Sequence, residues 1–282
     1  MARTSERAGA AAVATTREDG SSSQSIAAVE RAIDVLLLFS RSTAQSLGVT
    51  EISSELDMPK AAVHRILTSL RTRDLIAFEP SSRRYMLGAA ALALGRAYLG
   101  KIDIRALASE ELQALSRETG ETATLSVRHG DMRVYVDQVV PKREVRMEVA
   151  IGGSYPLHAG ASSKAFLAFM GGAERKAYLD RNPLQALTDK TLTSRTKLER
   201  DLAAARRSGY TSSYGERQTG AASVAAPVYD HDGQVVAVVS VSGPAERLRQ
   251  EADACAVELL AATGRLSARL GYLPSAAGGD DD

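Results

Sequence analysis

The stretch LDMPKAAVHRILTSLRTRDLI, residues 56–76, predicts an amphipathic helix that begins at Pro59. Its apolar residues recur at the i, i+3, i+4 and i+7 spacing of a helix side that faces a core, at Val63, Ile66, Leu67 and Leu70. The opposite side has no acidic residue and carries Lys60, Ala61, His64, Arg65, Thr68, Arg71 and Thr72. A helix in the major groove of DNA needs such a surface, because small side chains allow close approach and arginine can pair with a guanine edge.

The flanking residues predict a small module around this helix. SIAAVERAIDVLLLFS, residues 25–40, indicates a first helix with Ser25 as its N-cap and with apolar residues at helical spacing: Ile26, Val29, Ile33, Leu36 and Leu37. Thr50 is expected to cap a short second helix, and Pro59 to occupy the first position of the third. Residues 75–79 and 83–87 indicate two short strands. Three helices and a hairpin in this order predict a winged helix-turn-helix.

Charge changes sign along the module. Residues 30–59 have a net charge of −3, and residues 60–90 a net charge of +4, with Arg83 and Arg84 just after the hairpin tip. A basic side on a small module is typical of a phosphate binder. A winged helix that binds another protein is the alternative, and binding that does not depend on salt would favour it.

The composition indicates a soluble globular protein. The 282 residues suit two domains, with 44% hydrophobic and 24% charged residues and no apolar run long enough to span a membrane. A single cysteine, Cys255, excludes an internal disulfide framework and fits a reducing cytoplasm, where we expect the protein to reside. Residues 1–24 and 273–282 are small and polar and are expected to be a disordered arm and tail.

The second half of the chain predicts an α+β domain. We expect a winged helix-turn-helix over residues 25–88, a linker helix over the Ala- and Leu-rich residues 89–102, and a second domain over residues 103–272. In that second domain, an amphipathic helix ends at Gly120, two pairs of strands follow, and a long helix near residues 245–270 ends the fold. Antiparallel strands with helices packed on them make an α+β architecture.

One loop and two strands predict a pocket for a small organic acid. The loop-to-helix junction at residues 158–163 leaves backbone N–H groups free at a helix start, which favours an anion, and Gly160 permits close approach. Ser240 and Ser242 alternate with Val241, so their hydroxyls share one side of a strand, and Ser223 begins its neighbour. Met147 and Tyr155 are expected to supply apolar walls.

The sequence lacks the signatures of catalysis, metal binding and cofactor binding. GASSK resembles a nucleophile elbow, but Lys164 replaces its final glycine. The four histidines are far apart, and the sequence has no phosphate loop and no dinucleotide fingerprint. We therefore expect no catalytic residue, no metal and no cofactor. An enzyme that acts on a small carboxylate or ester is the alternative function, with His158 and Ser162 as its best candidate pair.

Residues 25–90 resemble the DNA-binding domain of IclR-type bacterial transcription regulators. YPLHAGASSKAFLA (155–168) and GYTSSYGERQTGAASVAAPVYDHDGQVVAVVSVSGP (209–244) resemble the effector-binding domain of that family, so the resemblance covers roughly residues 25–270. It implies a winged helix-turn-helix joined by a linker helix to a GAF-like α+β effector domain. It also implies a repressor, the commoner behaviour in the family. Because one winged helix binds a half-site, we expect a homodimer or homotetramer on a palindromic DNA operator.

The residues and the resemblance together predict two sets of contacts. The set expected to contact DNA is Lys60, Ala61, Ala62, His64, Arg65, Thr68, Arg83 and Arg84. The set expected to contact the effector is Met147, Tyr155, Gly160, Ala161, Ser162, Ser213, Ser223, Ser240 and Ser242. This chain departs from the family pattern at Ala61–Ala62, where Ser-Thr is common, at Ser223, where Cys is common, and at Ser213, where an acidic residue is common and Glu216 lies close by.

Overall fold

The computed structural model describes residues 27–99 and 103–273. The expected arm at residues 1–24 and the tail from residue 274 onward lie outside this range. The chain divides into two compact units, Met1–Tyr98 and Leu99–Asp282, and each is described here by itself. In the described part of the chain, no helix is long and apolar enough to cross a membrane.

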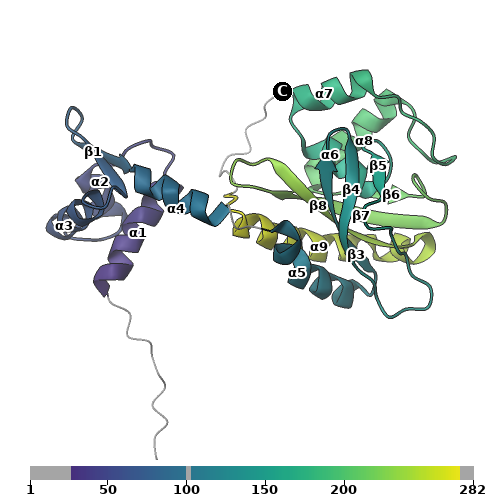
Figure 1. Cartoon of the computed structure of the whole chain (residues 1–282), viewed down its shortest axis with the longest axis horizontal. Helices are drawn as coiled ribbons and strands as arrows, with labels where there is room; N and C mark the ends of the chain where they lie inside the picture. The colour runs from purple at the N-terminus through teal and green to yellow at the C-terminus, as the bar shows by residue number, and fades with distance from the viewer. Residues whose placement is uncertain (1–26, 100–102, 274–282) are drawn as a thin grey trace, which may run out of the picture. The chain divides into compact units, whose positions relative to one another are not determined.

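The N-terminal unit has the predicted winged helix-turn-helix order (Figure 1). Helices α1 (Ala27–Arg41), α2 (Val49–Glu55) and α3 (Lys60–Arg71) precede a hairpin of β1 (Ile76–Glu79) and β2 (Arg84–Leu87), and α4 (Ala89–Leu99) follows. The strands pair antiparallel from Ile76 opposite Leu87 to Glu79 opposite Arg84. One core joins the helices to the hairpin, and its members include Val35, Phe39, Ile52, Val63, Leu67, Leu70, Ile76 and Tyr85.

The buried side of α1 differs from the predicted one. Val29, Ile33 and Leu37 are 51%, 49% and 41% exposed, whereas Val35 and Phe39 are buried. The second half of this helix is apolar on almost every side, so helical spacing alone fits more than one stripe, and contact with the neighbouring elements selects the buried one. Ser25 and Ile26 lie outside the described residues.

The starts of α2 and α3 also differ from the prediction. The Gly48 N–H donates to the Glu51 carboxylate at 2.8 Å, and α2 begins at Val49, so Thr50 lies inside the helix and does not cap it. Pro59 is the N-cap of α3 rather than its first residue. The side chain three positions into α2 therefore reaches back to satisfy a free N–H, as in the second half of a capping box.

The C-terminal unit is a six-stranded antiparallel sheet between helices (Figure 1). The chain order is α5 (Ile104–Thr119), β3 (Thr122–His129), β4 (Met132–Val139), β5 (Ser154–Pro156), α6 (Ala161–Phe169), α7 (Gly172–Arg181), α8 (Arg195–Ser208), β6 (Thr211–Tyr214), β7 (Ala221–Tyr229), β8 (Val235–Pro244) and α9 (Ala245–Arg269). The strands lie in the order β5-β4-β3-β8-β7-β6. This arrangement confirms the predicted α+β class.

The two faces of the sheet differ in chemistry. Alternate residues such as Leu125, Val224 and Val239 are buried against α5 and α9. Many of the residues between them bear hydroxyls, and four of these stand in register across β3, β8, β7 and β6: Thr122, Ser242, Ser223 and Ser213. We call these four residues the hydroxyl row. Because side chains alternate across a strand, apolar packing of one face brings the hydroxyl row to the other.

Candidate functional site

The polar side of α3 is exposed along its length. Lys60, Ala61, His64, Arg65 and Thr68 are all exposed and Ala62 is half-buried, while Val63 and Leu67 on the other side are fully buried. The Thr68 hydroxyl donates to the His64 carbonyl at 2.8 Å, so this donor is already used within the helix. In the part of the chain that the structure describes, no ion pair engages Lys60, His64 or Arg65. Their charged or polar ends can therefore reach a partner.

The two wing arginines have different environments. Arg83 is exposed and has a left-handed backbone, with φ of 55°. Arg84 instead points back to the module, where its Nη2 lies 2.7 Å from the Glu51 carboxylate and its Nε donates to the Ser46 hydroxyl at 2.9 Å. Hydrogen bonds from the Gly48 N–H, which is the larger cause, and from the Arg84 guanidinium lower the pKa of Glu51. The Arg84 guanidinium thus joins the wing to the region of α2, and its contact with DNA stays a prediction.

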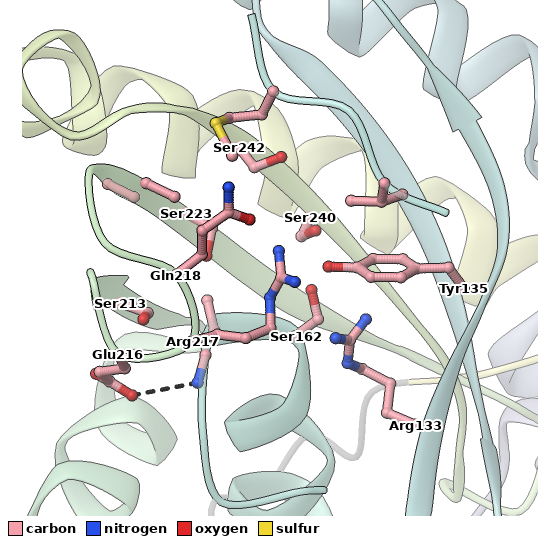
Figure 2. Close-up of a pocket in the computed structure, with 16 residues that line it drawn as sticks. Arg133, Tyr135, Ser162, Ser213, Glu216, Arg217, Gln218, Ser223, Ser240 and Ser242 are labelled. Carbon is pink, nitrogen blue, oxygen red and sulfur yellow. Dashed lines mark hydrogen bonds between the residues drawn. The ribbon is translucent and has the colours of Figure 1, made fainter. Parts of the chain in front are cut away.

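A polar cavity lies on the hydroxyl-bearing face of the sheet (Figure 2). About 450 Å³ of space free of protein atoms lies within its outline, and part of that space is open solvent. Eight of the nine predicted effector contacts line it: Met147, Gly160, Ala161, Ser162, Ser213, Ser223, Ser240 and Ser242. Tyr155, the ninth, does not line the cavity. Its ring packs edge-on against the ring of Tyr135, with 5.7 Å between the ring centroids, and Tyr135 does line the cavity. The tertiary structure thus brings together residues from β4, β6, β7, β8 and the start of α6.

The start of α6 presents its backbone to this cavity. Gly160 is the N-cap and has φ of 87°, a left-handed conformation that glycine adopts without strain. Ala161 and Ser162 form the first turn, whose N–H groups have no partner within the helix. These N–H groups and the helix dipole favour an anion at this point.

The serines of the sheet offer the cavity unequal hydrogen-bonding capacity. The Ser240 hydroxyl is 2.7 Å from that of Thr124, so each has one partner already. The Ser242 hydroxyl oxygen is buried and has no hydrogen-bond partner among the described residues. A buried hydroxyl without a partner is costly, and a ligand that bonds to it would remove that cost.

Two arginines in the cavity wall were missed by the sequence analysis. Arg133 is 1% exposed, and its guanidinium donates to Ser163 at 2.9 Å and to Ser126 at 3.1 Å. Burial lowers the pKa of Arg133 from its ordinary value. Arg217 follows Glu216 in the loop between β6 and β7 and also lines the cavity. The period-two pattern of RVYVDQV does place Arg133 beside Tyr135 on one strand face, but only the sheet order shows that this face is the cavity side.

A buried ion cluster fixes the loop that carries Arg217. Lys164 is 1% exposed, and its Nζ lies 2.7 Å from the Asp201 carboxylate and 2.6 Å from that of Glu216. The other Glu216 oxygen accepts from the Gly160 N–H at 3.3 Å. Lys164, which interrupts the apparent nucleophile elbow, therefore joins the start of α6 to the loop over the cavity.

The structure shows no catalytic pair at His158 and Ser162. The His158 Nε2 atom lies 2.8 Å from the Gln185 carbonyl, and no hydrogen bond joins this ring to Ser162 among the described residues. Within residues 27–99 and 103–273, no cluster of three or more His, Cys, Asp or Glu side chains could hold a metal ion.

Comparisons with known proteins match both halves of the chain. Residues 28–80 match the model of the IclR helix-turn-helix domain, and residues 96–268 match that of the bacterial transcriptional regulator IclR C-terminal domain. The chain is 35% identical to the HTH-type transcriptional regulator XynR of Escherichia coli, over 88% of this chain and 98% of that protein. It is 32% identical to the HTH-type transcriptional repressor AllR of Klebsiella pneumoniae, over 92% and 96%.

A solved structure has a similar fold. The crystal structure of a putative IclR transcriptional regulator from Silicibacter sp. TM1040 matches with a TM-score of 0.80 and 25% identity, over 87% of this chain and 96% of that one. The matched families and the named relatives are transcriptional regulators and not enzymes.

Proposed function

This chain belongs to the IclR family of bacterial transcriptional regulators, and from that premise we propose that it is a repressor whose DNA binding responds to a small organic acid. Residues 25–88 are the DNA-binding domain of this proposal and residues 103–272 the effector-binding domain. The observation that carries it is an exposed, acid-free side of α3 in the same chain as a cavity lined by arginines, serines and a helix start.

In the proposed complex, α3 lies in the major groove of an operator. Lys60, His64 and Arg65 contact bases or phosphates, and the small side chains of Ala61 and Ala62 allow the helix start to approach closely. Thr68 lies on the same side and adds a methyl group and an acceptor. At the wing, Arg83 makes the phosphate contact, because Arg84 is held by Glu51 and Ser46. Two chains, as a homodimer, bind the two halves of a palindromic site.

The acid binds in the cavity of the second domain. Ala161 and Ser162 provide N–H groups, and Ser223, Ser240 and Ser242 provide hydroxyls. A ligand shifts an equilibrium only as far as it binds one state more tightly than the other. The acid therefore releases the operator when it prefers an arrangement of the two DNA-binding domains that does not match the spacing of the half-sites.

The DNA-binding role is tested with duplexes selected from a random library by the full-length protein. Arg65→Ala should weaken binding by about 1–3 kcal/mol if Arg65 contacts a base and should relax the preference at that position. Arg117→Ala is the matched control, because Arg117 is an exposed arginine of α5 in the other unit. An Arg65→Ala protein that binds the selected duplex as tightly as the Arg117→Ala protein, over a range of salt concentrations, would contradict the proposed role of α3.

The effector role is tested with the same duplex and a panel of small carboxylates. A carboxylate that binds the folded protein raises its melting temperature, and the proposal predicts that the same compound releases the duplex. Ser242→Ala should reduce both effects together. A compound that raises the melting temperature but leaves DNA binding unchanged would separate binding from regulation and would contradict the proposed response.

A further inference from the structure

Two cations in the cavity wall have no carboxylate partner among the described residues. The guanidinium carbon of Arg133 lies 3.9 Å from the ring centre of Tyr135 and 5.0 Å from that of Tyr155, and the carbon of Arg217 lies 5.9 and 4.8 Å from the same rings. In the described part of the chain, neither arginine forms an ion pair. Lys164, the neighbouring buried cation, has two carboxylates. Of these three neighbouring cations, only the two arginines thus lack a carboxylate among the described residues.

The cavity wall itself cannot neutralise these charges. Of its lining residues only Glu216 is acidic, and that carboxylate is held by Lys164 and the Gly160 N–H. Arginine stays protonated in proteins, so burial of Arg133 keeps a charge in a poorly solvated place. The tyrosine rings compensate in part through their faces and leave the guanidinium edges open. Arg217 can grip a carboxylate with two hydrogen bonds, and Arg133 can use the N–H groups that do not donate to Ser126 and Ser163.

The two arginines face different parts of the cavity. Figure 2 shows Arg133 beside Tyr135 and Ser162, near the start of α6, and the Arg217 guanidinium pointing into the cavity on the side of Gln218 and Ser240. Beyond Arg217 lie Ser223 and Ser242 of the hydroxyl row, which are paired in register on β7 and β8. The hydroxyl of Ser242 is the one without a partner.

We propose that the ligand of this cavity is a small dicarboxylate, with Arg133 and Arg217 each taking one of its two carboxylates. The first carboxylate lies against Arg133, the Ser162 hydroxyl and the N–H groups that begin α6. The second lies against Arg217 and the hydroxyls of Ser223 and Ser242. This inference rests on the proposed function, because it names the class of acid that the effector cavity takes. It makes Arg217 the residue that distinguishes a dicarboxylate from a monocarboxylate.

The experiment is calorimetric titration of the full-length protein with matched probes. The dicarboxylates are the unbranched acids from malonate to adipate, and the controls are butyrate and succinamate, which carry one carboxylate on a similar skeleton. One dicarboxylate should bind at least about tenfold more tightly than either control, as expected for one additional charge-assisted contact. Arg217→Gln should remove that preference and leave monocarboxylate binding nearly unchanged, whereas Arg133→Gln should weaken both classes.

A second measurement separates ligand binding from folding. Because Arg217 is half-buried and has no ion-pair partner among the described residues, Arg217→Gln should leave the melting temperature of the unliganded protein unchanged or higher. A lower melting temperature would indicate a structural role instead. This variant keeps the test decisive even if Arg133→Gln, at a buried site, does not fold.

The outcomes distinguish this inference from the proposed function. Equal affinity for mono- and dicarboxylates, no effect of Arg217→Gln on the preference, or no binding of any dicarboxylate would overturn the dicarboxylate assignment. If a monocarboxylate then still released the operator duplex, the proposed function would stand. If a dicarboxylate bound with the expected dependence on Arg217 but DNA binding did not respond, the assignment would stand and the proposed regulation would fail.

Discussion

Replacement of Lys164 by methionine should destabilise the C-terminal unit and disturb the cavity together. Lys164 is buried between Asp201 and Glu216, at 2.7 and 2.6 Å. Methionine fills a similar volume but removes the charge, so that among the described residues the Glu216 carboxylate keeps only the hydrogen bond from the Gly160 N–H. A charge stranded in this way is the costly result of breaking a buried ion pair.

The magnitude follows from the exposure of the two carboxylates. The side chain of Asp201 is 39% exposed and can return to water, whereas that of Glu216 is only 10% exposed. One stranded carboxylate places the cost near the lower end of the range for broken buried pairs, about 3 kcal/mol. For a unit of this size, the melting temperature should fall by about 6–12 °C. Affinity for the acid should fall as well, because Glu216 positions the loop that carries Arg217.

The assay is calorimetric unfolding of the full-length protein with a double-mutant cycle. Lys164→Met should move the transition of the C-terminal unit and leave that of the N-terminal unit in place. Adding Glu216→Gln removes the stranded charge, so the double variant should recover at least about half of the lost free energy of unfolding. Such a coupling is well above the deviation from additivity that independent sites show. A single variant that costs less than about 1 kcal/mol, or a double variant with additive losses, would refute the claim that this pair is an electrostatic unit.

Three further predictions address other parts of the molecule. Hydrogen bonds from Arg181, the larger cause, and from Asn182 lower the Asp131 pKa to about 2, below its unfolded value of about 4. This contribution to stability is therefore complete above about pH 4 and is lost as the pH falls toward 2. The melting temperature of Asp131→Asn should depend less on pH over that range than that of the wild type. An equal pH dependence in the two proteins would count against a stabilising Asp131–Arg181 pair. Burial raises the pKa of Cys255 to about 11, so iodoacetamide at pH 8 should label the native protein far more slowly than the unfolded one, and equal rates would refute this. Arg83→Ala should lower the salt dependence of DNA binding by about one unit without changing thermal stability, whereas Arg84→Ala should lower the melting temperature of the N-terminal unit and leave the salt slope unchanged; the opposite pattern would reverse our assignment of the wing arginines.

The sequence was sufficient to predict helix α3, with its exposed acid-free side, and most of the lining of the cavity. Helical spacing identified Val63 and Leu67 as core residues of α3, and the acid-free side opposite them is exposed in the structure. Strand alternation placed Ser240 and Ser242 on one face, and both line the cavity. These predictions succeeded because they depend on the local geometry of a single helix or strand, which the order of residues specifies directly.

Only the tertiary structure decided which charges are neutralised. Arg84 and Arg83 are adjacent in the sequence, yet one is bound by Glu51 and the other is exposed. Lys164 gained two carboxylates from distant segments, while Arg133 gained none within the part of the chain that the structure describes. The sequence identifies which residues are charged. Coulomb energy and desolvation depend on the distances between segments and on burial, which are defined only once the sheet order and the loops are in place.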